Sequence, residues 1–307
     1  MTLNDVHWAD GASMDFDCVA EMLRVDGYAL IRGMFEPEDI QRLRDIVGGH
    51  LEEGGARYSL GKTQPNAAAH VPALGFIFTH PHVVALFRGI FGHRTTMFTR
   101  HCDIHKNMVS GWHKDSGETV KGGYFKDDYF AADDCQVYKI AVYLQDATPL
   151  SGLTIEPRSH RTARIRGGDT LQLPTRIGDA VIFDVRLSHS GQLPDTVERG
   201  LKLLSRLFNK GRRNGQDAKL VTWLHDVYWH FLGRADRMST FFTFGRANVF
   251  TYDFAAANLD RQARQFSQTA KDSVDNVQDI AAELDRQGVL TYGIGIGTEE
   301  HALEMAR

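Results

Sequence analysis

The sequence of 307 residues has few cysteines, no long apolar run and no excess of positive charge. Cys18, Cys102 and Cys135 are odd in number and widely spaced, which argues against a disulfide framework and predicts a reducing, cytoplasmic location. No segment approaches the roughly 18 apolar residues that cross a membrane. The net charge of −4 gives no reason to expect nucleic acid or an anionic membrane as a partner, so we expect a small-molecule substrate.

The N-terminal part of the chain has a helical pattern. Hydrophobic residues make up 42% of the sequence and charged residues 24%, which is typical of a globular protein with a large core. Apolar residues at helical spacing predict helices at 17–26, 36–47 and 81–91, with one strand at 28–35. We therefore expect residues 1–94 to form a helical scaffold with one strand.

From residue 95 the hydrophobic period changes to two. Short apolar segments separated by turn residues predict strands up to residue 210, the last of them at 201–208. Beyond that point the period is helical again. The predicted fold is mainly β with flanking helices. It is one catalytic domain over 1–307, with a jelly-roll core at 95–210 and a C-terminal helical extension at 211–307.

Two predicted strands have a polar face that could line a cavity. In the strands 95–108 and 138–145, residues of one parity are mostly polar and residues of the other are mostly apolar. These polar faces comprise His101, Asp103, His105 and Asn107 in the first strand, and Lys139, Tyr143 and Gln145 in the second. Contact with a ligand and a plain structural role both stay open for them.

His113 and Asp115, two positions apart, form the local pattern that most suggests chemistry. In a strand, alternate side chains leave the same face roughly 6 to 7 Å apart, so an imidazole nitrogen and a carboxylate oxygen can converge on a divalent metal ion. His101 and Asp103 repeat the pattern and are a rival pair.

His189 is a candidate third ligand, because it follows the apolar strand 180–185 after a Gly-Asp turn. Two imidazoles and one carboxylate leave coordination positions open, which suits a non-haem Fe(II) oxygenase. A hydrolytic metal site is the alternative, since zinc binds the same ligand types, usually with tetrahedral geometry.

Four segments resemble the motifs of the phytanoyl-CoA dioxygenase family. They are Asp-Gly-Tyr-Ala-Leu-Ile-Arg-Gly at 26–33, Trp-His-Lys-Asp at 112–115, Ser-Gly-Leu-Thr-Ile-Glu-Pro-Arg-Ser-His at 151–160, and Gly-Asp-Ala-Val-Ile-Phe-Asp at 178–184, followed by His189. The resemblance covers about residues 17–208, with one departure at Arg158, where the family usually has glycine. It implies a 2-oxoglutarate-dependent Fe(II) oxygenase on a double-stranded β-helix, the cupin-like jelly roll.

The resemblance also implies a residue that binds the far carboxylate of 2-oxoglutarate. The family's arginine lies about ten residues beyond the distal histidine, at the start of the last core strand, and Arg199 stands at that place. Ser190 resembles the hydroxyl that assists the same carboxylate. Lys202 and Arg206, on the same segment, are rivals to Arg199.

The implied cofactors are Fe(II), 2-oxoglutarate and dioxygen, with His113, Asp115 and His189 as catalytic metal ligands in preference to His101 and Asp103. Related halogenases have a small residue in place of the carboxylate. Asp115 therefore predicts hydroxylation, desaturation or ring formation at an unactivated C–H bond of a small molecule, in a setting such as secondary metabolism.

Two other classes of function stay open on this fold. A cupin-like metal enzyme without oxidative chemistry would not need Arg199, and a catalytically inactive binding protein would not need the intact ligand set. Apolar stripes on the C-terminal helices also suggest a homodimer formed through that region.

Overall fold

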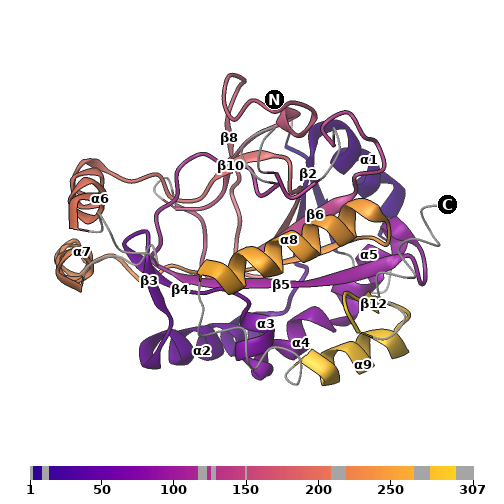
Figure 1. Ribbon diagram of the computed structural model, residues 1–307, viewed down its shortest axis with the longest axis horizontal. Coiled ribbons are helices and arrows are strands. Elements are labelled where there is room, and N and C mark those ends of the chain that lie inside the picture. The colour runs from indigo at the N-terminus through magenta and orange to yellow at the C-terminus, as the bar shows by residue number, and fades with distance from the viewer. Residues whose placement is uncertain are drawn as a thin grey trace.

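The computed structural model describes residues 3–8, 14–116, 123–125, 129–148, 151–208, 219–265 and 277–294, and the structural statements below concern these residues. Their core is a mixed sheet of nine strands that packs against a smaller sheet of three (Figure 1). In this part of the chain no single helix is long and apolar enough to cross a membrane. The helix pair Pro72–Phe78 and Pro81–Phe91, bent by 50°, has the length and the composition of a membrane-crossing segment only when its two helices are taken together.

The two sheets are those of a jelly roll, which confirms the predicted fold class. The larger sheet has the order β1 (Asp5–His7), β2 (Tyr28–Arg32), β9 (Ala180–Asp184), β6 (Val137–Tyr143), β11 (Met238–Arg246), β5 (Thr96–Lys106), β4 (Gly61–Gln64) and β3 (Ala56–Tyr58), and β12 (Leu290–Thr291) pairs with β5. The smaller sheet has the order β10 (Ser188–Ser190), β7 (Thr154–Glu156) and β8 (Leu171–Gln172). A bridge between His113 and His189 adds the segment before Asp115 to its edge.

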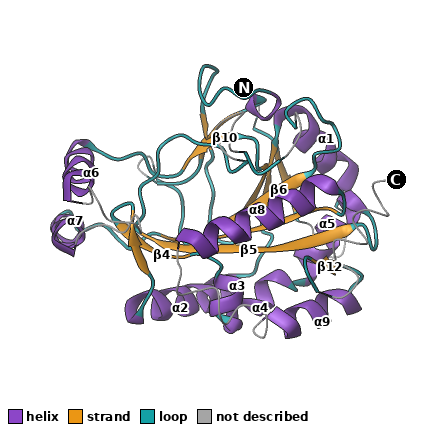
Figure 2. Ribbon diagram, in the orientation of Figure 1, coloured by secondary structure: helices purple, strands orange, loops and turns teal. Residues whose placement is uncertain are grey.

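Helices cover both sides of the larger sheet. They are α1 (Phe16–Asp26), α2 (Pro37–Glu53), α3 (Ala67–His70), α4 (Gly75–Phe78), α5 (Pro81–Phe91), α6 (Thr196–Phe208), α7 (Lys219–Phe231), α8 (Val249–Gln265) and α9 (Gln278–Arg286), with 3-10 turns at Pro72–Leu74 and Ser159–Arg161. Figure 2 shows α2, α3, α4 and α9 along one side of β5 and α8 along the other. In α2, Ile40, Leu43 and Val47 form the buried stripe that packs into the core.

Strand β6 separates two apolar clusters. Tyr138, Ile140 and Val142 pack into the cluster formed with the helices, whereas Ala141 and Tyr143 pack toward the smaller sheet. This confirms the division of the strand that the sequence predicts. It also directs the polar side chains of the second face into the space between the sheets.

The last core strand differs from the prediction. Residues 201–208 belong to helix α6, where Leu201 and Leu204 lie on one face and pack beside the buried Val221 of α7. The strand that completes the core is β11, which inserts between β5 and β6. The core therefore extends beyond residue 210, and 211–307 is not simply a helical extension. The error has a physical reason, because closely spaced leucines in a short segment fit either period. The prediction of one strand within 1–94 is also wrong, because the described residues there form β1, β2, β3 and β4.

Candidate active site

Three side chains converge in the cavity between the sheets. Nε2 of His113 lies 3.8 Å from Oδ1 of Asp115, and Nε2 of His189 lies 3.3 Å from Oδ2 of Asp115. One ligand atom from each residue lies within 4.8 Å of the others. The backbone brings the two segments together, since the N–H groups of His113 and His189 each donate to the other's carbonyl at 3.0 Å. This donor set fits a single divalent metal ion.

Hydrogen bonds orient both imidazoles. Nδ1 of His113 lies 2.8 Å from the carbonyl oxygen of Gly111, and Nδ1 of His189 lies 2.9 Å from that of Leu187. Each ring therefore carries its proton on Nδ1 and turns the lone pair of Nε2 toward Asp115. This is the tautomer that a metal ligand requires.

The electrostatics of the site favour the metal-binding protonation states. Burial, reinforced by His113, lowers the pKa of His189 to about 3, so its imidazole is neutral at physiological pH. Burial by itself would raise the pKa of Asp115, but Lys139, His189 and His113 hold it well below its ordinary value. The ammonium of Lys139 lies 2.7 Å from Oδ2 of Asp115. The carboxylate is therefore ionised before any metal binds.

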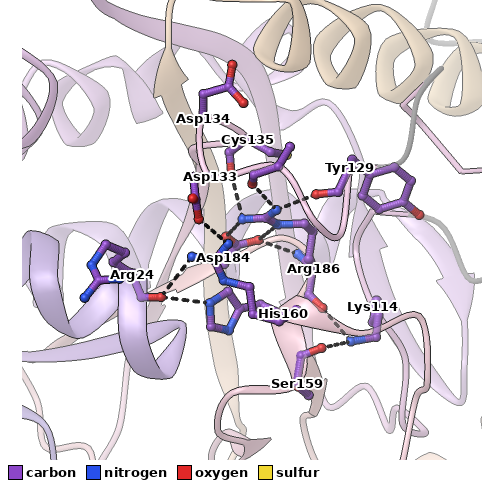
Figure 3. Close-up of polar contacts among 12 residues, drawn as sticks. Arg24, Lys114, Tyr129, Asp133, Asp134, Cys135, Ser159, His160, Asp184 and Arg186 are labelled. Carbon is purple, nitrogen blue, oxygen red and sulfur yellow. Dashed lines mark hydrogen bonds and ion pairs between the residues drawn. The ribbon is translucent and has the colours of Figure 1, made fainter.

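Lys114 supports the backbone of the segments that carry the candidate ligands. Its side chain is 3% exposed, and Nζ donates to the carbonyl oxygens of Ser159 and Arg186, both at 2.6 Å (Figure 3). Oγ of Ser159 in turn accepts a hydrogen bond of 2.8 Å from the backbone N–H of Ser188, which precedes His189. Lys114 thus ties the segment that carries two ligands to the segment that carries the third.

A buried ion pair fixes the turn before β10. Figure 3 shows the guanidinium of Arg186 against the carboxylate of Asp184, with Nε to Oδ1 at 2.9 Å and Nη2 to Oδ2 at 2.7 Å. Its remaining donors bind the carbonyl oxygens of Tyr129, Ala132 and Cys135. Because both side chains are almost fully buried, this fully paired network makes the turn rigid.

The cavity has a volume of about 680 Å³ and continues beyond the three candidate ligands His113, Asp115 and His189. Arg237, at the start of β11, lines it together with Tyr143 of β6 and Ser239. Ser239 pairs with Tyr143 in the sheet, and Arg237 lies two positions before Ser239, so the three share one face. Among the described residues, Nη1 of Arg237 and Oη of Tyr143 are buried without a hydrogen-bond partner.

The structure does not bring Arg199 to this cavity. Arg199 lies exposed on α6, where Nε donates to the carbonyl oxygen of Asp195 at 3.3 Å. It is absent from the cavity lining because its segment is a helix and not the last core strand. Ser190 is buried but does not line the cavity either, and its Oγ donates to the carbonyl oxygen of Ser110 at 3.0 Å. Both assignments are therefore corrected.

Arg237 is the residue that the sequence analysis missed. It precedes a run rich in Phe and Thr, 238–244, that has strong β propensity, and this was the available sign of a further strand. The rivals of Arg199, Lys202 and Arg206, do line the cavity from α6.

The polar face predicted for β5 also lines the cavity, with His101, Asp103 and His105. Both ring nitrogens of His101, in the rival pair, have hydrogen-bond partners within the protein. Nε2 lies 3.1 Å from Oδ2 of Asp103, and Nδ1 lies 2.7 Å from Oγ1 of Thr243. Lys139 and Tyr143 line the same space. Gln145 has a structural role, since its Oε1 accepts a hydrogen bond from the backbone N–H of Met238 at 2.8 Å.

The departure at Arg158 falls in a turn. Arg158 has φ of 68° and ψ of −2°, in the left-handed region that glycine adopts without strain. Its Nε donates to Oδ1 of Asp26 at 2.7 Å, and its backbone N–H donates to the carbonyl oxygen of Asp26. The turn is thereby kept although the residue is not glycine.

Comparisons with known proteins agree with this geometry. The family model for phytanoyl-CoA dioxygenase (PhyH) matches residues 23–192. The non-heme alpha ketoglutarate dependent epimerase SnoN from nogalamycin biosynthesis has a TM-score of 0.51 and 16% identity, over 76% of this chain and 83% of that chain. The carbocyclase SnoK from the same biosynthesis has a TM-score of 0.50 and 15% identity, over 75% and 83%. These identities show a shared fold. No curated protein sequence gives a significant match.

Proposed function

The chain belongs to the phytanoyl-CoA dioxygenase family, and we propose that His113, Asp115 and His189 hold the Fe(II) with which it oxidises an unactivated C–H bond of a small molecule. It is a 2-oxoglutarate-dependent iron enzyme whose cofactors are Fe(II), 2-oxoglutarate and dioxygen. The observation that supports these ligands is the convergence of one donor atom from each within 4.8 Å, with Asp115 ionised and His189 neutral.

We propose Arg237, in place of Arg199, as the residue that binds the far carboxylate of 2-oxoglutarate. Burial lowers the pKa of Arg237 to about 10, so the guanidinium stays charged at neutral pH. Its unpartnered Nη1 and the unpartnered Oη of Tyr143 are two buried donors that a carboxylate would satisfy. Arg237 also directly precedes β11, the strand that completes the core, and the family resemblance implies an arginine at the start of such a strand.

The bound iron and 2-oxoglutarate supply the oxidising chemistry, which consumes dioxygen and releases succinate and carbon dioxide. The chain's own residues set the geometry. Hydrogen bonds to Gly111 and Leu187 aim the two imidazoles, and Lys139 keeps Asp115 ionised by facing its Oδ2. The intact carboxylate at Asp115 supports hydroxylation, desaturation or ring formation as the outcome. We propose secondary metabolism as the setting of this reaction.

One spectroscopic experiment tests this function against the two alternatives. Anaerobic addition of Fe(II) and 2-oxoglutarate should produce a weak visible charge-transfer band, because the keto acid chelates the iron. A non-oxidative metal enzyme or an inactive binding protein on the same fold would give no such band. Its absence from the metal-loaded protein would overturn the proposal.

We also propose that the partners are the small-molecule substrate and a second copy of the chain, and that neither nucleic acid nor a membrane is bound. The support for a homodimer is the apolar surface of α6 and α7, where Leu207 is 65%, Trp223 58% and Phe231 84% exposed. In Figure 1 both helices lie at one edge of the molecule, beside the end of the larger sheet that carries β3. Light scattering should give twice the monomer mass, and Trp223→Asp should give a monomer; a wild-type monomer contradicts the proposal.

Two further proposals concern organisation and location. We propose that the whole chain is one catalytic domain, because β5, β6 and the late strand β11 lie side by side in one sheet. We propose the cytoplasm as its location, supported by the free state of Cys18, Cys102 and Cys135.

A further inference from the structure

A second group of polar residues lines the cavity where β5 meets α8. Figure 1 shows α8 running along β5, and cavity residues come from both elements. They are His101, Asp103 and His105 from β5 and Asn258 and Arg261 from α8. Neither the metal ligands nor the proposed cosubstrate residues belong to this group.

The charges in this group are matched within the protein. The carboxylate of Asp103 accepts hydrogen bonds from Nε2 of Gln262 at 2.8 Å and from the backbone N–H of Asn66 at 3.3 Å, and its other oxygen faces His101. Nη2 of Arg261 donates to Oδ1 of Asn258 at 3.0 Å. Burial opposes ionisation of Asp103, but His101, His105 and Arg261 hold its pKa well below the ordinary value. This anion is therefore already stabilised without a ligand.

Two neutral side chains of this group, His105 and Asn258, line the cavity. Asn258 is 2% exposed, and its Nδ2 has no partner in the part of the chain that the structure describes. The imidazole of His105 packs beside the ring of Phe241, with ring centroids 5.1 Å apart. In the sheet, residue His105 lies opposite Thr63 of β4 on one side and Ser239 of β11 on the other. Burial lowers the pKa of His105 to about 4, so the ring is neutral and offers one donor and one acceptor.

We propose that His105 and Asn258 form the substrate subsite, and that it takes an uncharged molecule bearing a hydroxyl group on an otherwise apolar frame. A hydroxyl both donates and accepts, so it can bond either the imidazole of His105 or the amide N–H of Asn258, and a molecule with two hydroxyls can bond both. Phe241, whose ring packs beside His105, provides the apolar contact. Neither side chain offers an anion a counter-charge, and the nearby cation Arg261 already faces the carboxylate of Asp103. This inference rests on the proposed function, since the bound group must lie in the same cavity as the iron.

Three cyclohexane derivatives test the subsite on the anaerobic Fe(II)–2-oxoglutarate enzyme: trans-1,4-cyclohexanediol, cyclohexanecarboxylate and cyclohexyl phosphate. Ligand-observed NMR titration should show that the diol binds more tightly than either anion. His105→Leu and Asn258→Leu should each weaken binding of the diol by up to about tenfold, because each removes one hydrogen bond. His105→Gln, which keeps a donor and an acceptor, should lose less. Ala256→Gln, on the exposed face of α8, is the matched control and should bind the diol as the wild type does.

The outcomes separate the two proposals. If the wild-type charge-transfer band is absent, the proposed function fails whatever the diol does. If the band is present but an anion binds more tightly than the diol, or both leucine variants bind the diol normally, the subsite inference fails while the function stands.

Discussion

The cavity has two regions that differ in how their polar atoms are satisfied. Around the metal ligands, backbone carbonyls hold both imidazoles, and Lys114 has two carbonyl partners at 2.6 Å. Farther along the cavity, Nη1 of Arg237, Oη of Tyr143 and Nδ2 of Asn258 are buried without partners among the described residues. The first region is built in advance to receive an ion. We expect organic ligands to complete the second, because unpaired buried polar groups are costly until a ligand pairs with them.

Asp115→Ala should have the largest effect, because it removes the anionic ligand from the preorganised region. We expect loss of the charge-transfer band and of succinate formation, down to the level of metal-free protein. Anaerobic spectra and a succinate assay measure both. Undiminished turnover of 2-oxoglutarate in this variant would contradict the assignment of the ligand set.

A matched pair of arginine variants tests the second region. Arg237→Met should raise the KM for 2-oxoglutarate by about 10- to 100-fold, because hydrogen bonds to a charged group are worth about 1.5–3 kcal/mol. Arg199→Met, on the exposed face of α6, should leave that KM unchanged. The reverse pattern would return the role to Arg199. Equal, small effects would argue for Lys202 or Arg206 instead.

Substitutions of Lys114 test whether its hydrogen bonds to the carbonyl oxygens of Ser159 and Arg186 affect the affinity for Fe(II). Lys114→Met leaves the carbonyls of Ser159 and Arg186 without their donor, and loss of such outer contacts typically costs about 10-fold in metal affinity. Fe(II) titration and the position of the charge-transfer band are the measurements. Lys114→Arg, which keeps the charge and the donors, should recover part of the affinity. Unchanged Fe(II) affinity in a folded Lys114→Met variant would show that the hydrogen bonds of Lys114 are not needed for metal binding.

The smallest expected effect is on the pH dependence of stability. Since burial lowers the pKa of His105 to about 4, from an ordinary value of about 6.5, the unfolded chain binds a proton at this residue that the folded chain does not. The metal-free protein should therefore lose stability as the pH falls from about 6.5 to about 4. His105→Leu should lose less over that window, by about 1 kcal/mol or more, in urea titrations at each pH. Parallel pH profiles would contradict this.

The sequence alone predicted the three side chains that converge at one end of the cavity. His113 and Asp115 are two positions apart, and His189 follows an apolar strand and a turn, so local geometry and short motifs were enough to predict that they share a cavity. The fold class followed for a similar reason, because short apolar segments and the turn residues between them can each be recognised locally.

Only the tertiary structure decided the rest. Arg237 could not be assigned without knowing that β11 enters the sheet between β5 and β6, after the helices α6 and α7. Arg199, close to His189 in sequence, lies on an exposed helix. Asn258 reaches the cavity because α8 packs along β5, far from it in the chain. The physical reason is that hydrogen bonding between strands and packing between elements join residues that no local spacing relates.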